Sequence, residues 1–137
     1  MVNKKKKGKN AIVLLSHNLL EHQIEELERK WNVGNIIYLP EELQKRWSNV
    51  DPELEFYNKD SLINDINKFI ENNSYKEDII IVQGEAGVTF SVVNLCFELG
   101  RKPIYATTKR VSQEVKVNGQ VIIKRIFKHV RFREYLR

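Results

Sequence analysis

The sequence predicts an α/β fold: an open, mostly parallel β-sheet flanked by helices, with an antiparallel β-hairpin near the C-terminus. Short apolar runs alternate with helical patterns through residue 106, as in chains built from strand-helix-strand units. The pattern then changes to two strand-like segments on either side of Asn118-Gly119, the strongest short-range signal for a tight hairpin. No internal repeat interrupts this order, so one domain accounts for it.

The strands are predicted from apolar runs of four or five residues. Such runs are apolar throughout, as expected for strands that helices cover on both faces. The predicted strands are residues 11–15, 36–39, 79–82 and 103–106, with hairpin strands at 111–117 and 120–127.

The helices are predicted from apolar residues at helical spacing. Their ends are marked by residues that favour caps or turns, such as Asp60 at an N-terminus and Gly34 or Gly100 after a C-terminus. The predicted helices are residues 19–31, 40–47, about 61–73, and the stretch after the loop 83–87, with an irregular connection at 48–57.

Length and composition predict one domain at residues 11–137, preceded by a disordered lysine-rich tail at 1–10. No apolar run approaches the roughly 20 residues that span a bilayer, so no membrane partner is expected. Cys96 is the single cysteine and lies in an apolar stretch, which predicts a buried thiol without an intrachain disulfide. We expect a cytoplasmic location.

The formal net charge of +5 is unevenly distributed. Five lysines among residues 4–9 account for all of it. Residues 10–104 carry a net −7, and residues 105–137 carry a net +7. This asymmetry predicts a local anion site near the C-terminal third and no DNA partner, because duplex binding needs a broader basic stripe.

Polar segments follow three of the predicted strands. Right-handed crossovers place the C-terminal ends of parallel strands at one edge of the sheet, and ligands bind there where the strand order reverses. The segments expected to meet are Ser16-His17, Gln83 to Gly87, and Thr107 to Arg110.

The glycine loop is a candidate phosphate site because glycine permits close backbone approach and a helix N-terminus attracts anions. Its spacing matches neither a Walker loop nor the dinucleotide fingerprint. A plain strand-to-helix turn is an equal alternative, since Glu85 would repel phosphate. The candidate ligand-binding residues are Gln83, Gly84, Glu85, Ala86 and Gly87.

The cationic segment Thr107-Thr108-Lys109-Arg110 offers two hydroxyls and two fixed cations suited to a phosphodiester. A solvated loop is the alternative. If the last strand continues past Phe127, period-2 alternation puts more basic side chains on one face, either as a cationic stripe or as a charged edge strand. These residues are Arg125, His129, Arg131 and Arg133.

The three histidines lack metal-ligand spacing, so no metal and no cofactor are expected. His17, at a strand end, is the best-placed group for proton transfer, although local hydrogen bonding is the commoner fate of such a residue. Ser16 could contact phosphate or a ribose hydroxyl. It lies in no nucleophile elbow, so a serine hydrolase is not predicted.

Several strings together resemble a known family. They are Ala11-Ile-Val-Leu-Leu-Ser-His17, Ile37-Tyr-Leu-Pro-Glu-Glu-Leu43, Val82-Gln-Gly84, Ile104-Tyr-Ala-Thr-Thr-Lys-Arg110 and Phe127-Lys-His-Val-Arg-Phe-Arg133. They are similar to the small accessory proteins of type III CRISPR systems in the Csx group, the member numbered twenty. The resemblance covers almost the whole chain after the lysine tail.

The resemblance implies a Rossmann-like domain related to the CARF domains that sense cyclic oligoadenylates. It implies a ring nuclease that cleaves the messenger, foremost cyclic tetra-adenylate, and so switches off this antiviral signalling. In such enzymes a hydroxyl residue follows the first strand and a basic residue lies in a later loop. Ser16 and Lys109 occupy those places.

The chemistry expected from the resemblance is metal-independent attack of a ribose 2′-hydroxyl on the adjacent phosphate. In this hypothesis Lys109 and Arg110 stabilise the transition state. Ser16 and the amides of residues 84–87 orient the phosphate, and His17 or His129 assists proton transfer. A symmetric ring favours a homodimer.

Two alternatives remain open. A non-catalytic protein of the same fold could bind the same ligand as a sensor or sponge, and fold alone does not separate the two. A regulator that binds a mononucleotide or RNA is the third hypothesis, supported only by the basic stripe.

Overall fold

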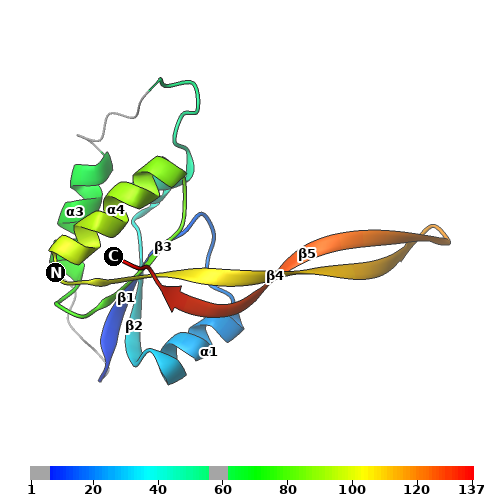
Figure 1. Cartoon of the computed structure of the whole chain (residues 1–137), viewed down its shortest axis with the longest axis horizontal. Helices are drawn as coiled ribbons and strands as arrows, with labels where there is room; N and C mark the ends of the chain where they lie inside the picture. Colours follow the sequence, from blue (N-terminus) through cyan, green and yellow to red (C-terminus); the bar gives the residue numbers. More distant parts are fainter. Residues whose placement is uncertain (1–6, 56–61) are drawn as a thin grey trace.

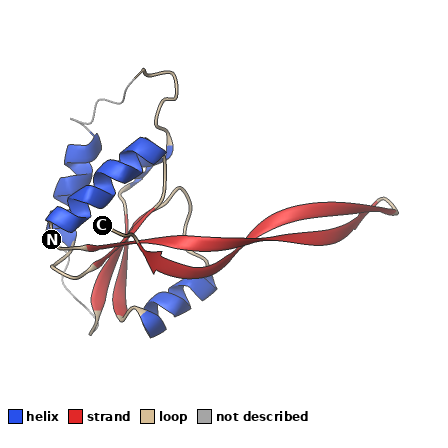
Figure 2. Ribbon diagram, in the orientation of Figure 1, coloured by secondary structure: helices blue, strands red, loops and turns tan. Residues whose placement is uncertain are grey.

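The computed structural model describes residues 7–55 and 62–137, and it confirms an α/β fold with a mixed five-stranded sheet (Figures 1 and 2). The described elements, in chain order, are β1 (Lys9–Leu14), α1 (Glu21–Lys30), β2 (Val33–Tyr38), α2 (Glu41–Ser48), α3 (Leu62–Asn73), β3 (Ile79–Val82), α4 (Ala86–Glu98), β4 (Lys102–Val117) and β5 (Gln120–Glu134). No helix in these ranges is both long and apolar enough to cross a membrane.

The sheet has the strand order β2-β1-β3-β4-β5. The β1/β2, β1/β3 and β3/β4 pairs are parallel, and β4/β5 is antiparallel. The chain moves outward from β1 to β2 and then returns to the other side of β1 for β3. The order therefore reverses between β1 and β3, which is where ligands bind in open α/β sheets.

Helices cover both faces of the parallel strands, which is why those strands are apolar throughout. Helix α1 packs on one face, where Leu27 joins Val13, Ile81 and Phe132 in one core cluster. Helices α2, α3 and α4 cover the opposite face and form a second cluster with alternate residues of the same strands. Both clusters consist mainly of aliphatic side chains that are almost completely buried.

The β4/β5 hairpin is much longer than the sequence predicts. Only Lys102 to Ile104 of β4 pair with β3, whereas β4 and β5 remain paired along their whole lengths. The hairpin therefore leaves the sheet and projects from the body (Figure 1). The predicted turn is present, with positive φ angles of 51° at Asn118 and 77° at Gly119.

Two predictions about this region are wrong. Residues 107–110 lie within β4 and do not form a loop after it. The register shifts opposite Thr107 and Thr108, so Val130 has no partner, and this bulge interrupts the alternation of β5. Arg133 accordingly lies over Tyr105, and Arg131 borders a separate hollow with Trp31, so no single cationic stripe joins them to Arg125 and His129.

Other boundaries differ by small amounts. Strand β1 begins at Lys9, two residues inside the predicted tail, and Asn10 is buried against Asp78. Residues 1–6 of the tail lie outside the described residues, as do Asp60, the predicted N-cap, and the end of the 48–57 connection.

Candidate functional site

A pocket of about 420 Å³ opens at the edge of the sheet where the strand order reverses. It brings together six of the predicted site residues: Ser16, His17, Gln83, Gly84, Thr108 and His129. Five further residues complete its lining, namely Leu15, Leu20, Gln23, Ala106 and Phe127. Segments distant in the sequence therefore meet at one site, as the topology predicts.

The other predicted site residues do not line this pocket. They are Glu85, Ala86, Gly87, Thr107, Lys109, Arg110, Arg125 and Arg131. Most residues of the glycine loop and the cationic segment therefore lie outside the lining of this pocket, and their predicted ligand contacts stay a prediction.

Gln83 lines the pocket, but its side chain has a structural role. Its Oε1 accepts a hydrogen bond from the backbone N–H of Ala106 at 2.8 Å, and its Nε2 donates to the Ala106 carbonyl at 3.3 Å. The amide thus continues the β3/β4 ladder one step past the last backbone pair, Ile81 with Ile104. Gln83 fixes β4 at the point where the hairpin leaves the sheet.

Gly84 is glycine because of a neighbouring tryptophan. A Cβ at this position would lie 2.8 Å from Cζ2 and 2.9 Å from Cε2 of Trp47. Trp47 is buried in the α2/α3/α4 cluster and has little room to move. The glycine therefore permits close packing beside the pocket.

The N-terminus of α4 already carries an anion of its own. The Glu85 side chain accepts a hydrogen bond from the backbone N–H of Val88 at 2.8 Å and caps the helix. A carboxylate in this place satisfies the positive end of the helix, so an incoming phosphate would be repelled. The predicted phosphate site at the amides of residues 84–87 is not supported.

The cationic segment divides between the two sides of β4, because residues in a strand alternate. Thr108 lines the pocket, and Arg110 lies on the same side with its guanidinium 5.3 Å from the centroid of the Phe127 ring. Lys109 projects from the opposite side. Thr107 also faces away, and its hydroxyl donates to the carbonyl of Arg131 at 2.8 Å.

His17 is an exposed imidazole at the pocket wall. Its Nδ1 lies 2.9 Å from the carbonyl oxygen of Asn18, which can only accept a hydrogen bond, so Nδ1 carries the proton in the neutral ring. Its Nε2 then has a free lone pair and no partner among the described residues. This nitrogen can accept a proton from a bound ligand.

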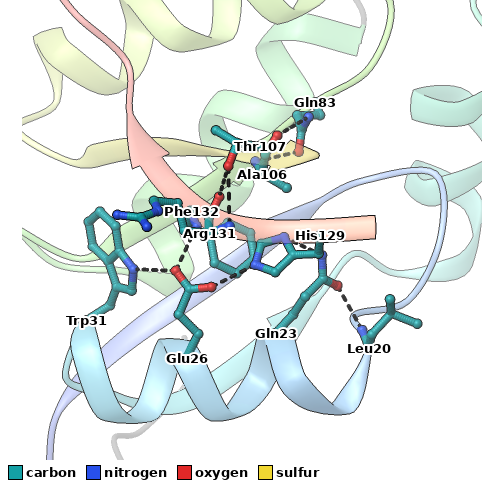
Figure 3. A network of polar contacts seen from close by, with 10 residues as sticks. All are labelled: Leu20, Gln23, Glu26, Trp31, Gln83, Ala106, Thr107, His129, Arg131 and Phe132. Atoms are coloured by element: carbon teal, nitrogen blue, oxygen red, sulfur yellow. Dashed lines mark hydrogen bonds and ion pairs between the residues drawn. The ribbon is translucent and has the colours of Figure 1, made fainter. Parts of the chain in front are cut away.

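His129 differs, because both of its ring nitrogens are engaged (Figure 3). The Gln23 Oε1 accepts from the Leu20 N–H at 2.9 Å, so the amide nitrogen of Gln23 faces His129 Nδ1 at 3.2 Å. An amide NH₂ can only donate, so Nδ1 is an acceptor and the proton is on Nε2. His129 is therefore a neutral, fixed part of the pocket and is unsuited to proton transfer.

The Glu26 carboxylate completes this network (Figure 3). Its Oε1 accepts from His129 Nε2 at 2.7 Å, and its Oε2 accepts from the Phe132 N–H at 2.7 Å and from Trp31 Nε1 at 3.5 Å. Burial raises the pKa of this carboxyl, but the hydrogen bonds from His129, Phe132 and Trp31 outweigh burial and bring the pKa below its ordinary value.

Sequence reasoning did not identify Gln23, Glu26 or Phe127 as site residues. Gln23 and Glu26 occur in a helix rich in charged residues, where such side chains usually face solvent. Phe127 was predicted only as the end of a strand, yet its ring is 65% exposed at the mouth of the pocket. The only available signal was an aromatic residue within a basic segment.

Comparison with known proteins gives a family. The family described as "Uncharacterized protein MJ1673 family" matches residues 9–133. The chain belongs to the MJ1673 family. It is similar to the protein "Uncharacterized protein MJ1673" of Methanocaldococcus jannaschii, with 37% identity over 123 residues that cover 90% of this chain and 94% of the relative. No solved structure matches.

The match to the MJ1673 family extends across β1, both sides of the pocket and nearly all of β5. The family description names no ligand and no reaction. The function of this member is therefore argued from its own pocket.

Substitution of Gly84 tests the close packing beside the pocket. We expect Gly84→Ala to lower the free energy of unfolding by about 1–3 kcal/mol, because the new methyl group overpacks against Trp47. Urea denaturation followed by tryptophan fluorescence measures the change. Gly87→Ala is the matched control, since its Cβ would meet only the flexible Glu85 side chain at 3.3 Å. Equal stability of the two variants would contradict the packing argument.

Substitution of Glu26 tests the network behind the pocket. We expect Glu26→Ala to lower the free energy of unfolding by about 2 kcal/mol or more, because three donors lose an acceptor. Glu25→Ala, at an exposed position of the same helix, should change it by less than about 0.5 kcal/mol. Denaturation in urea at neutral pH gives both values.

The pH dependence of stability, compared between wild type and Glu26→Ala, gives a further test. The pKa of Glu26 is lower in the folded than in the unfolded state. The contribution of Glu26 to the free energy of unfolding is therefore complete above the ordinary carboxyl pKa of 4.5, and it is lost as the pH falls through the folded-state pKa. The stability difference between wild type and Glu26→Ala should therefore narrow below pH 4.5. A difference that grows in acid would refute this assignment.

Proposed function

We propose that this chain is a Rossmann-like, CARF-related protein whose pocket binds one nucleotide unit of a cyclic oligoadenylate, foremost cyclic tetra-adenylate. One observation carries the proposal: the pocket combines an exposed aromatic ring, two hydroxyls and a free imidazole nitrogen, and the Arg110 guanidinium lies 5.3 Å from the centroid of that ring. It lies where the order of the strands reverses. The resemblance to the Csx group points to the same ligand.

The base would stack on Phe127. Stacking on an aromatic side chain is a common means of holding an unpaired base, and it contributes about 1–3 kcal/mol per base. The ring is solvent-exposed on the pocket side of β5, and Leu20, which is 52% exposed, also lines the pocket. Arg110, already beside this ring, can reach a phosphate next to the stacked base.

The volume of the pocket suits one nucleotide unit and not a whole ring of four. Small-ligand pockets span roughly 300–1,000 Å³, and this one is near the lower end. The hydroxyls of Ser16 and Thr108 are placed to contact ribose or phosphate oxygens. The remaining units of a ring would extend out of the pocket mouth past Arg110.

Cleavage would follow the route implied by the resemblance. The 2′-oxygen attacks the adjacent phosphorus, the bond from phosphorus to the 5′-oxygen breaks, and a 2′,3′-cyclic phosphate forms. The proton of the 2′-hydroxyl passes to His17 Nε2, and the departing 5′-oxygen takes a proton from solvent water to become a hydroxyl. Arg110 stabilises the negative charge that develops on the phosphate.

Binding without cleavage is the second candidate, and one observation favours it. No lysine or arginine lines the pocket among the described residues, and transition-state charge in phosphoryl transfer is usually neutralised by fixed cations. A sensor or sponge would need only the stacking and hydrogen-bonding groups.

Substitution of Phe127 tests binding. We expect Phe127→Ala to weaken the affinity for cyclic tetra-adenylate by about 5- to 150-fold, the equivalent of one stacked base. Isothermal titration calorimetry measures the dissociation constant. The matched control is Ile123→Ala, since Ile123 is 66% exposed on the same side of the hairpin but outside the pocket. Equal affinities for the two variants would exclude Phe127 as the stacking platform.

A second experiment tests cleavage and the assignment of the cation. Purified protein is incubated with cyclic tri-, tetra- and hexa-adenylate in excess chelator, and the products are separated by chromatography. We expect linear adenylates that end in a 2′,3′-cyclic phosphate. Arg110→Ala should slow their formation at least tenfold, whereas Lys109→Ala, on the opposite side of β4, should leave it unchanged.

Each outcome has a definite meaning. Tight binding without product after long incubation would establish the non-catalytic candidate and refute the ring nuclease. Loss of turnover in Lys109→Ala alone would restore the role that the resemblance implied for Lys109. Preference for linear RNA over all three rings would refute the proposed ligand.

A further inference from the structure

The side of the hairpin that faces the pocket continues well beyond the pocket mouth. Thr108 and Phe127 line the pocket, and side chains alternate along each strand, so every second cross-strand pair of β4 and β5 faces the same way. We call the side that carries these pairs the pocket side. From the pocket outward, its pairs are Thr108/His129, Arg110/Phe127, Ser112/Arg125, Glu114/Ile123 and Lys116/Val121.

Arg125 is the first cation on the pocket side after Arg110. It is exposed and lies opposite Ser112, one pair farther from the pocket than Phe127. Among the residues that the structure describes, its guanidinium has neither a hydrogen bond nor an ion pair. The planar fork of donors is therefore available to a ligand, and its geometry suits the oxygens of a phosphate.

The spacing along the pocket side suits consecutive phosphates. Successive pairs on one side of a strand lie about 7 Å apart, which is close to the separation of neighbouring phosphates in an extended nucleotide chain. A base stacked on Phe127 places its own phosphate beside Arg110. The next phosphate of the same chain then lies at the Ser112/Arg125 pair, where the serine hydroxyl can donate a further hydrogen bond.

Continuity with the pocket distinguishes this side from the opposite one, and charge alone does not. The opposite side carries as many cations, namely Lys109, Lys124 and Lys128, but no aromatic ring. Between Thr108 and His129, only the pocket side offers both a stacking ring and cations. Proteins bind single strands of nucleic acid with this combination.

Glu114 limits the length of the cationic surface. It is exposed and belongs to the pair that follows Arg125 on the pocket side. Its carboxylate faces the same way as the two arginines, so it would repel a third phosphate. Lys116 lies beyond this carboxylate, so a long single strand meets no continuous cationic path. The pocket side therefore suits a short oligonucleotide or ring that presents two phosphates.

We propose that Arg110 and Arg125 form a subsite for two consecutive phosphodiesters, and that the ligand must therefore contain at least two linked nucleotide units. Arg110 contacts the phosphate beside the stacked base, and Arg125 anchors the next one. This inference rests on the proposed function, since it takes a base to stack on Phe127, and it adds the length and charge that the ligand must have. Ile123, in the pair beyond Arg125, stays outside the subsite.

The test compares Arg125→Ala with Lys124→Ala, which removes the same charge one residue away on the opposite side of β5. Isothermal titration calorimetry on the full chain gives dissociation constants for cyclic tetra-adenylate, linear tetra-adenylate and AMP. We expect Arg125→Ala to weaken binding of both tetra-adenylates about tenfold, because a charge-assisted hydrogen bond to phosphate is lost. Lys124→Ala should leave both within about twofold of wild type. AMP has no second phosphate, so all three proteins should bind it equally.

The salt dependence of binding reports the number of phosphate contacts. For both tetra-adenylates, the slope of log Kd against log salt concentration should become shallower by about 0.7 in Arg125→Ala, the value of one contact to a single strand. The slope should not change in Lys124→Ala. Equal constants and slopes in the two variants would overturn the proposal. A loss of AMP binding in Arg125→Ala as large as the loss of tetra-adenylate binding would overturn it as well.

Glu114 gives an independent test of the length limit. In wild type, the salt slope for linear octa-adenylate should equal that for linear tetra-adenylate. Glu114→Gln should let the longer chain reach Lys116 and steepen its slope by about 0.7, while binding of cyclic tetra-adenylate stays the same. A wild-type slope that steepens with chain length would overturn the limit at Glu114 and identify a general surface for single strands.

Failure of this inference and failure of the proposed function give different results. Binding of cyclic tetra-adenylate that depends on Phe127 but not on Arg125 refutes only the subsite. Binding of linear but not cyclic tetra-adenylate, weakened in Arg125→Ala and retained in Lys124→Ala, refutes only the proposed ring. Absence of binding to all of these ligands refutes both.

Discussion

The Glu26 carboxylate is the contact on which the site and the hairpin both depend. Strand β5 is the edge of the sheet, so the N–H of Phe132 has no strand beyond it, and Glu26 accepts that hydrogen bond. Its other oxygen holds His129, whose side chain is 3% exposed. The Glu26 carboxylate thus joins α1 to β5 at His129 and Phe132, on either side of the bulge at Val130. It is stable there because donors surround it, as a desolvated carboxylate requires.

The body of the fold could be predicted from the sequence because its signals are local. Continuous apolar runs identify β1 and β3, helical periodicity identifies α1 and α3, and Asn118-Gly119 identifies the turn. The long hairpin could not be predicted with its true bounds, because residues such as Thr107 to Arg110 suit a loop and a strand equally. Strand β4 extends through them because they pair with residues 17 to 24 positions away, from Arg110 with Phe127 to Thr107 with Arg131.

The location of the site followed from topology, whereas the roles of its residues did not. Chain order alone placed Ser16, Gly84 and Thr108 at one edge. The role of Gly84 depends on close packing against Trp47. The role of Gln83 depends on the backbone pairing of β3 with β4 ending before Ala106, so neither role is visible in the local sequence. The bulge at Val130 is equally hidden, because a one-residue shift in a long-range register reverses every later side chain.

The alternation of side chains along the β4/β5 hairpin decides which of its residues face the pocket. At the base of the hairpin, the side chains of Gln83 and Glu26 bond the backbone of β4 and β5 to the body, and the Thr107 hydroxyl joins β4 to β5. Farther out, within the described residues, β4 and β5 pair only with each other, and period-2 geometry separates the Arg110/Phe127 pair from the Val111/Ile126 pair next to it. Only one side of the hairpin therefore faces the pocket, because adjacent residue pairs face opposite ways.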